Sequence, residues 1–204
     1  MSTYLAKIQI TKWLLLAAIV AFQPFSLMAK DNAPELYRRI VTGTNSQGKS
    51  IILFDSSAPT IKEFKGAGIY STEIWETNQA PASNFGSDDL SAHEFILGPP
   101  DAGSRFRIVE ILPEPENVSG DSLKGTGSHV ESKLHPMMHA TDSVDYIVIL
   151  KGEIYAIVET GEVLLKAGDV FVQRGTAHAW ANRSNKPCVF AAVLVDANPV
   201  KKGH

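Results

Sequence analysis

Residues 135–182 read HPMMHATDSVDYIVILKGEIYAIVETGEVLLKAGDVFVQRGTAHAWAN, and this stretch decides the fold. Short runs of β-branched and aromatic residues are interrupted there by single glycines, namely Gly152, Gly161, Gly168 and Gly175. Short strands at even spacing are typical of an antiparallel sandwich or barrel. The stretch also contains His139 and His178, which neighbouring strands of a small barrel can bring to one site.

The composition of the other segments also predicts strands and gives no amphipathic helix. Six strands are expected near the C-terminal end, at 145–151, 154–159, 162–166, 169–173, 178–183 and 188–196. Four more are expected earlier, at 37–42, 50–54, 69–77 and 104–112. Both alternating faces of 146–150 are apolar, so the outside of the barrel wall needs a cover from the N-terminal strands or from a second subunit.

The first residues carry a predicted export signal. Residues 13–22 (WLLLAAIVAF) follow Lys7 and Lys12, and a small-residue exit lies near Ala29. We therefore expect a cleaved signal peptide at 1–29 and a protein that is secreted or periplasmic. An uncleaved anchor is the alternative, but a membrane span takes about 20 apolar residues. Because Gln23 and Pro24 interrupt the run, no stable membrane insertion is expected after cleavage.

Length and charge limit the remaining classes. A chain of 204 residues with 44% hydrophobic content can bury one domain and an extra arm. The formal charge is −3 and the basic residues are scattered, which argues against nucleic-acid binding. Cys188 is the single cysteine, so no internal disulfide can form, and its apolar neighbours predict an inert core thiol.

The predicted organisation has four parts. A signal peptide (1–29) precedes N-terminal strands that cover or extend the barrel (30–112), a polar loop (113–133) and the barrel core (134–197). A loop of about 20 residues is uncommon inside a compact domain. It is expected to be either a lid over a site or a plain surface excursion.

Two motifs resemble those of the cupin superfamily. Residues 168–182 are similar to its second motif, G-x5-P-x-G-x2-H-x3-N, although the two glycines are one residue closer and Gln173-Arg174 stands at the proline step. In the first motif, His139 matches the first histidine, Thr141 stands at the second, Asp145 replaces the glutamate and Gly152 closes the motif. The chain resembles more closely the small cupin-domain proteins labelled oxidoreductases in fungal biosynthetic clusters. The resemblance implies an antiparallel, jelly-roll-like β-barrel with an N-terminal strand arm.

Three functions remain open for this barrel. In the first, His139, His178 and Asp145 bind a divalent Fe, Mn, Zn or Ni ion, and the protein is an oxidoreductase or dioxygenase acting on a small molecule. In the second, no metal is present and His139 or His178 is the general base of a dehydratase, isomerase or decarboxylase. In the third, the protein only binds a small molecule. The expected substrate contacts are Met137, Thr141, Trp180 and Asn182, and the expected assembly is a homodimer.

Overall fold

The computed structural model describes residues 34–124 and 126–200. The predicted signal peptide at 1–29 lies outside these residues. Within the described ranges, no helix has the length and apolarity needed to cross a bilayer. The single helical element there is one turn of 3-10 helix, η1 (Asp121–Leu123), so the predicted all-β class is confirmed.

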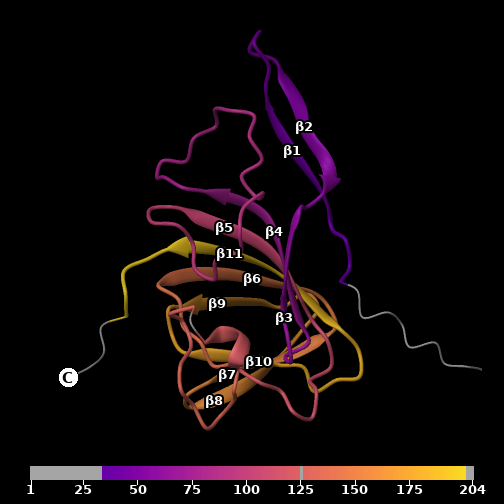
Figure 1. Ribbon diagram of the computed structural model, residues 1–204, viewed down its shortest axis with the longest axis vertical. Coiled ribbons are helices and arrows are strands. Elements are labelled where there is room, and N and C mark those ends of the chain that lie inside the picture. Colours follow the sequence, from indigo (N-terminus) through magenta and orange to yellow (C-terminus); the bar gives the residue numbers. More distant parts are fainter. Residues whose placement is uncertain (1–33, 125, 201–204) are drawn as a thin grey trace, which may run out of the picture. The chain divides into compact units, whose positions relative to one another are not determined.

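Antiparallel strands form two sheets that face each other as a barrel (Figure 1). The larger sheet has the order β3 (Thr60–Phe64), β4 (Ile69–Thr77), β5 (Ser104–Ile111), β11 (Cys188–Asp196), β6 (Ser143–Lys151) and β9 (Val170–Arg174). The smaller sheet has the order β10 (His178–Ala181), β7 (Glu153–Val158) and β8 (Gly161–Lys166). The strands of segment 60–111 therefore extend one wall of the barrel.

The alternation of side chains along each strand fills the space between the sheets. On β6, Ile147 and Ile149 point inward and are buried, whereas Tyr146, Val148 and Leu150 are exposed on the outer face. The inward side chains of both sheets form one apolar cluster. This cluster surrounds the cavity described below.

The N-terminal hairpin of β1 (Arg38–Thr44) and β2 (Ser50–Ser57) forms a sheet of its own and projects from the barrel (Figure 1). Its base covers part of the outer face, because Tyr37 and Ala58 pack with Ile74, Ile108 and Val189. The outer faces of β6 and β9 are not covered in this way, and Tyr146, Val148, Val170 and Val172 stay exposed there. The predicted arm thus covers the wall only in part.

Strand β3 differs from the sequence prediction, and the predicted loop at 113–133 adds contacts to the barrel. Strand β3 was not expected, because it combines Lys62 and Glu63 with few apolar residues. It still pairs along its whole length with β4, from Thr60 opposite Glu73 to Phe64 opposite Ile69. The loop at 113–133 packs against the barrel: Ser119 N donates to Gly66 O at 3.3 Å, and Leu123 is 1% exposed within the core.

Candidate active site

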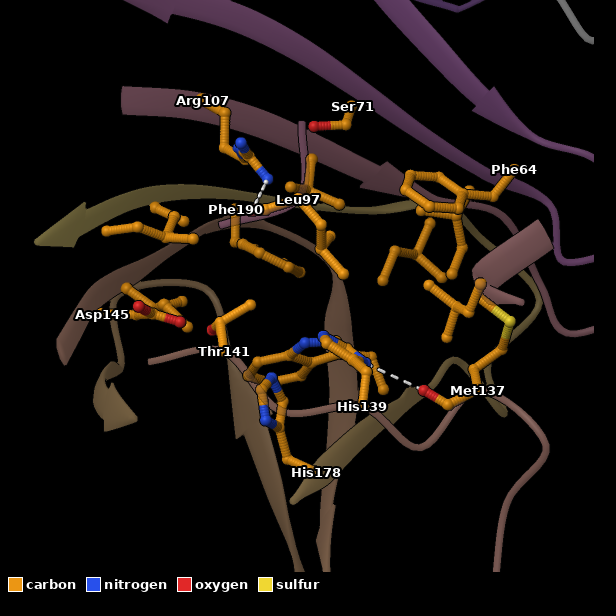
Figure 2. A pocket seen from close by; sticks show the side chains of 18 of the residues that line it. Phe64, Ser71, Leu97, Arg107, Met137, His139, Thr141, Asp145, His178 and Phe190 are labelled. Atoms are coloured by element: carbon orange, nitrogen blue, oxygen red, sulfur yellow. Dashed lines mark hydrogen bonds between the residues drawn. The ribbon is translucent and has the colours of Figure 1, made fainter. Parts of the chain in front are cut away.

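A cavity of about 80 Å³ lies inside the barrel. Its polar lining consists of Ser71, Arg107, His139, Thr141, Asp145 and His178, and Arg107 lies across the cavity from His178 (Figure 2). The rest of the lining is mostly apolar and includes Phe64 and Met137 (Figure 2). Its apolar lining includes Phe95, Leu97, Leu123, Ile147, Trp180 and Phe190. A mainly apolar pocket with a few converging polar groups is the usual form of a small-molecule site.

Backbone pairing brings the two predicted histidines together. His139 N donates to His178 O and His178 N donates to His139 O, each at 2.9 Å, so the residues are directly opposite each other. Paired residues place their side chains on the same face. The ring centroids are accordingly 4.2 Å apart, and both rings line the cavity. His139 and His178 thus lie together at one site, as expected from the sequence.

The tautomer of each imidazole follows from its backbone contact. His139 Nδ1 lies 2.9 Å from Met137 O, and His178 Nδ1 lies 2.9 Å from Thr176 O. A carbonyl oxygen only accepts, so Nδ1 carries the proton and donates it. Burial lowers the pKa of His178 to about 3, and the neighbouring His139 adds to this effect. Burial also lowers the pKa of His139. For His178, the expectation of a base with a near-neutral pKa is therefore wrong.

Asp145 is a buried acid of this site with a raised pKa. Its side chain is on β6, 5% exposed, and Ser143 Oγ donates to Asp145 Oδ1 at 2.6 Å. Because the hydroxyl proton of Ser143 goes to Asp145, the 2.8 Å contact between Thr141 Oγ1 and Ser143 Oγ has Thr141 as its donor. Burial raises the pKa of Asp145 to about 6, although Ser143 and Arg107 oppose that rise.

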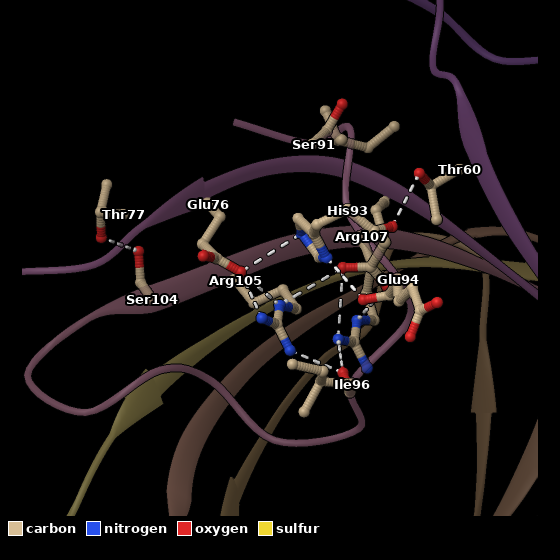
Figure 3. Close-up of polar contacts among 12 residues, drawn as sticks. Thr60, Glu76, Thr77, Ser91, His93, Glu94, Ile96, Ser104, Arg105 and Arg107 are labelled. Atoms are coloured by element: carbon tan, nitrogen blue, oxygen red, sulfur yellow. Dashed lines mark hydrogen bonds and ion pairs between the residues drawn. The ribbon is translucent and has the colours of Figure 1, made fainter. Parts of the chain in front are cut away.

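Arg107 is a cavity residue that the sequence analysis did not select. It lies on β5 and forms a buried ion pair with Glu73 on β4, with 3.2 Å between Arg107 Nε and Glu73 Oε1. Arg107 also donates to Leu97 O and Ile96 O, each at 3.0 Å. Arg105 donates to Ile96 O at 2.6 Å and pairs with Glu76 (Figure 3). The two arginines thereby hold segment 96–98, which forms one wall of the cavity.

A sequence signal for this network was present. Arg105 and Arg107 are two residues apart on a predicted strand with apolar neighbours, so both face the same side of the sheet. Charged side chains on the buried face of a strand require partners. The alternation pattern alone left open which face pointed inward.

The predicted substrate contacts separate into two groups. Met137, Thr141 and Trp180 line the cavity. Asn182 does not line it: Asn182 Nδ2 donates to Ile111 O and Lys186 O, each at 2.8 Å, and its Oδ1 accepts from Ser184. The structure thus gives Asn182 a structural role in place of the expected substrate contact. Burial also raises the pKa of Cys188 to about 12, as suits an inert core thiol.

Known proteins with similar sequences identify the family of this chain. Residues 127–195 match the model of the Cupin domain family. A phomopsin biosynthesis cluster protein C' of Diaporthe leptostromiformis is 32% identical over 182 residues, covering 83% of this chain and 84% of that protein. The chain belongs to the cupin superfamily. A cupin-domain-containing oxidoreductase, fogC, of Aspergillus ruber is 29% identical over 171 residues, covering 79% of this cupin and 73% of the relative.

Solved structures also resemble this cupin at low identity. A putative ethanolamine utilization protein q from Salmonella typhimurium has a TM-score of 0.40 and 13% identity, covering 81% of this chain and 100% of that one. A double-stranded β-helix protein from Klebsiella pneumoniae has a TM-score of 0.41 and 16% identity, covering 69% and 86%.

The cupin fold raises the question of a metal centre. His139 and His178 suit a metal in one respect, since each donates Nδ1–H to a carbonyl and leaves Nε2 as the ligand atom. Protein centres for Fe, Mn or Zn normally use a third protein ligand. Within 34–124 and 126–200, no three His, Cys, Asp or Glu side chains gather as a metal site. The residues as placed, including Asp145, therefore do not fit the predicted mononuclear centre.

Proposed function

We propose that this cupin is a small-molecule enzyme whose central step is a proton transfer between Asp145 and a ligand held in the barrel. The observation that carries the proposal is the presence of Asp145, His139 and His178 in the lining of one mostly apolar cavity. A buried carboxyl near neutrality can both accept and return a proton. The pKa of about 6 at Asp145 supports this role.

The reaction class follows from the groups present. The Asp145 carboxylate takes a proton from a carbon next to a carbonyl group, and the resulting carboxylic acid returns it to another atom of the ligand. Return of the proton to a different carbon is an isomerisation, and loss of a neighbouring hydroxyl as water is a dehydration.

Deuterium exchange tests this step while the natural substrate is still unidentified. The purified protein is incubated in D2O with a panel of small ketones, aldehydes and enones, and exchange of the proton next to the carbonyl is followed by NMR. We expect catalysed exchange for members of the panel, reduced about 10²- to 10⁴-fold in Asp145→Asn. Exchange at equal rates in wild type and Asp145→Asn would refute the proposal. Asp142→Asn, at an exposed position directly before Ser143, is the matched control and should exchange like wild type.

An O2-using oxidoreductase is the second candidate function. The curated relatives in Aspergillus ruber and Hypocrea virens, both named cupin-domain-containing oxidoreductases, favour it. Oxygen uptake with the same panel is its assay, combined with analysis of Fe, Mn, Zn and Ni in wild type, His139→Ala and His178→Ala. If oxygen uptake requires one bound metal, and both variants lose that metal and the uptake, the oxidoreductase candidate would be favoured over the acid–base enzyme.

We also propose a homodimer that covers the outer face of β6 and β9. Tyr146 lies opposite Val172 and Val148 lies opposite Val170, so these exposed apolar residues form two adjacent cross-strand pairs. A patch of this kind on an outer sheet face suits a self-complementary contact, in which each copy covers the other. Light scattering after gel filtration should give twice the mass of one chain. Val172→Lys should return a monomer, and a monomeric wild type would contradict the proposal.

A further inference from the structure

Two hydrogen-bond acceptors face the cavity without a donor. With the proton on Nδ1, the Nε2 atoms of His139 and His178 carry lone pairs. Among the hydrogen bonds of the described residues, none involves either Nε2 atom. Both rings line the cavity and lie 4.2 Å apart. The site therefore presents a pair of closely spaced acceptors to whatever enters.

The neighbouring hydroxyls do not supply that donor. Thr141 donates its proton to Ser143, and Ser143 donates to Asp145. Both protons are thus directed toward the carboxyl and away from the imidazoles. A polar group in a largely apolar cavity loses free energy when its hydrogen bond is missing. A ligand that brings an O–H group would satisfy the acceptor pair.

The charges around the cavity do not favour an anionic ligand. Arg107 is paired with Glu73 through contacts of 3.2 and 3.3 Å, and both side chains are buried. Arg105 is paired with Glu76. The two buried cations are thus matched by two carboxylates, and Asp145 is a further acid in the cavity lining. A carboxylate or phosphate would add an unpaired negative charge beside it.

The size and lining of the cavity limit the rest of the ligand. Aromatic and aliphatic side chains make up most of the lining, and the aromatic ones are Phe64, Phe95, Trp180 and Phe190. A dry cavity of about 150 Å³ is known to hold benzene. This cavity has about 80 Å³ and is partly open, so a single ring that reaches into the opening is the largest apolar body that it suits.

We infer that the cavity binds an uncharged molecule with a compact apolar body and a hydroxyl group that donates to Nε2 of His139 or His178. The inference rests on the proposed function in placing the ligand inside the barrel. It goes further in naming the class of ligand and the two residues that select the hydroxyl.

Three probes of one ring each test the inference by calorimetry on the full chain. Phenol carries the hydroxyl, benzene lacks it and benzoate carries a charge. Wild type should bind phenol about fivefold more tightly than benzene, as one net hydrogen bond provides, and should bind benzoate most weakly. In His139→Leu/His178→Leu the preference for phenol should disappear while benzene still binds, which also shows that the variant is folded. Asn185→Ala, an exposed position outside the cavity lining, should keep the wild-type preference.

Other results would overturn the inference. These are benzoate binding as tightly as phenol, a phenol preference that survives in the double variant, or no binding of any probe at millimolar concentration. Side-chain ¹⁵N NMR of the wild type gives a check without substitution, because phenol should shift the Nε2 signals and leave Nδ1 protonated. Asp145→Asn separates the two proposals. If it keeps the phenol preference and the wild type fails to exchange deuterium, the proposed function fails and the ligand class stands.

Discussion

Ser143 Oγ donates a 2.6 Å hydrogen bond to Asp145 Oδ1, two residues along the same face of β6. This bond favours the charged carboxylate, whereas burial disfavours it more strongly, so the pKa of Asp145 stays at about 6. The balance between one short hydrogen bond and desolvation keeps the carboxyl able to change its protonation state near neutral pH. The proposed chemistry of this cupin depends on that balance.

Asp145→Asn should stabilise the protein at neutral pH. The folded pKa of about 6 exceeds the ordinary value of 3.8, so the stability that Asp145 contributes is present below pH 3.8 and is lost as the pH rises through 6. Asparagine accepts the same Ser143 bond without a charge. Above pH 7 the free energy of unfolding should rise by up to about 3 kcal/mol, and the gain should shrink toward pH 4. Urea unfolding of both proteins at several pH values measures the difference.

His178→Gln should make the protein less sensitive to acid. The pKa of His178 is lowered from 6.5 to about 3, so between these values the unfolded chain binds a proton that the folded chain does not. Wild-type stability then falls with decreasing pH by about 1.4 kcal/mol per unit from this residue. The slope from Asp145 has the opposite sign between pH 4 and 6. The contributions of His178 and Asp145 to the pH dependence of stability are separated when each variant is compared with wild type. An unchanged slope in His178→Gln would refute the lowered pKa.

Asn182→Ala should weaken the fold and spare the cavity. Its amide joins Ile111 on β5 to the turn at Lys186, and its oxygen accepts from Ser184. Loss of these buried bonds should lower the free energy of unfolding by about 2 to 3 kcal/mol. Phenol affinity, measured below the unfolding transition, should match wild type. Asn185→Ala, an exposed position on the same turn, serves as the control and should change neither quantity.

Arg107→Met should destabilise the fold more than the double variant Glu73→Gln/Arg107→Met. The single change leaves the buried carboxylate of Glu73 without its closest partner and releases the carbonyls of Ile96 and Leu97. Removal of one member of a buried pair costs about 3 to 5 kcal/mol, whereas removal of both costs less. Thermal unfolding of the two single variants and the double variant gives the coupling. Additive losses would mean that the pair does not act as a unit.

The sequence predicted the parts of this site that depend on alternation and motif spacing. His139 and His178 were expected to meet at one site from neighbouring strands if the faces that carry them point inward, and the glycines between them separate the strands. Asp145 was selected as a metal ligand, but its side chain is bound to Ser143 and joins no metal-binding group in the described ranges. The direction of such a side chain depends on tertiary contacts, and the spacing of residues in the sequence does not specify these contacts.

The remaining differences have similar causes. Strand β3 forms through pairing with β4 despite Lys62 and Glu63, because sheet pairing outweighs local preference. The alternation of side chains does not show which face of β5 points inward, so it does not place Arg107. Its position in the cavity wall depends on Glu73, which is far from it in the sequence. The pKa of Asp145 is raised to about 6 and the pKa values of the two histidines are lowered, because burial lowers the pKa of a base and raises that of an acid. Burial of a single side chain is a tertiary property, which composition does not specify.

Direct titration of the Asp145 carboxyl carbon by ¹³C NMR, assigned with Asp145→Asn, tests the central claim. The account predicts a midpoint close to pH 6, on the folded protein and without any ligand. A midpoint near the ordinary value of 3.8 would mean that the carboxylate is permanently charged at neutral pH and would contradict its role as the proton carrier.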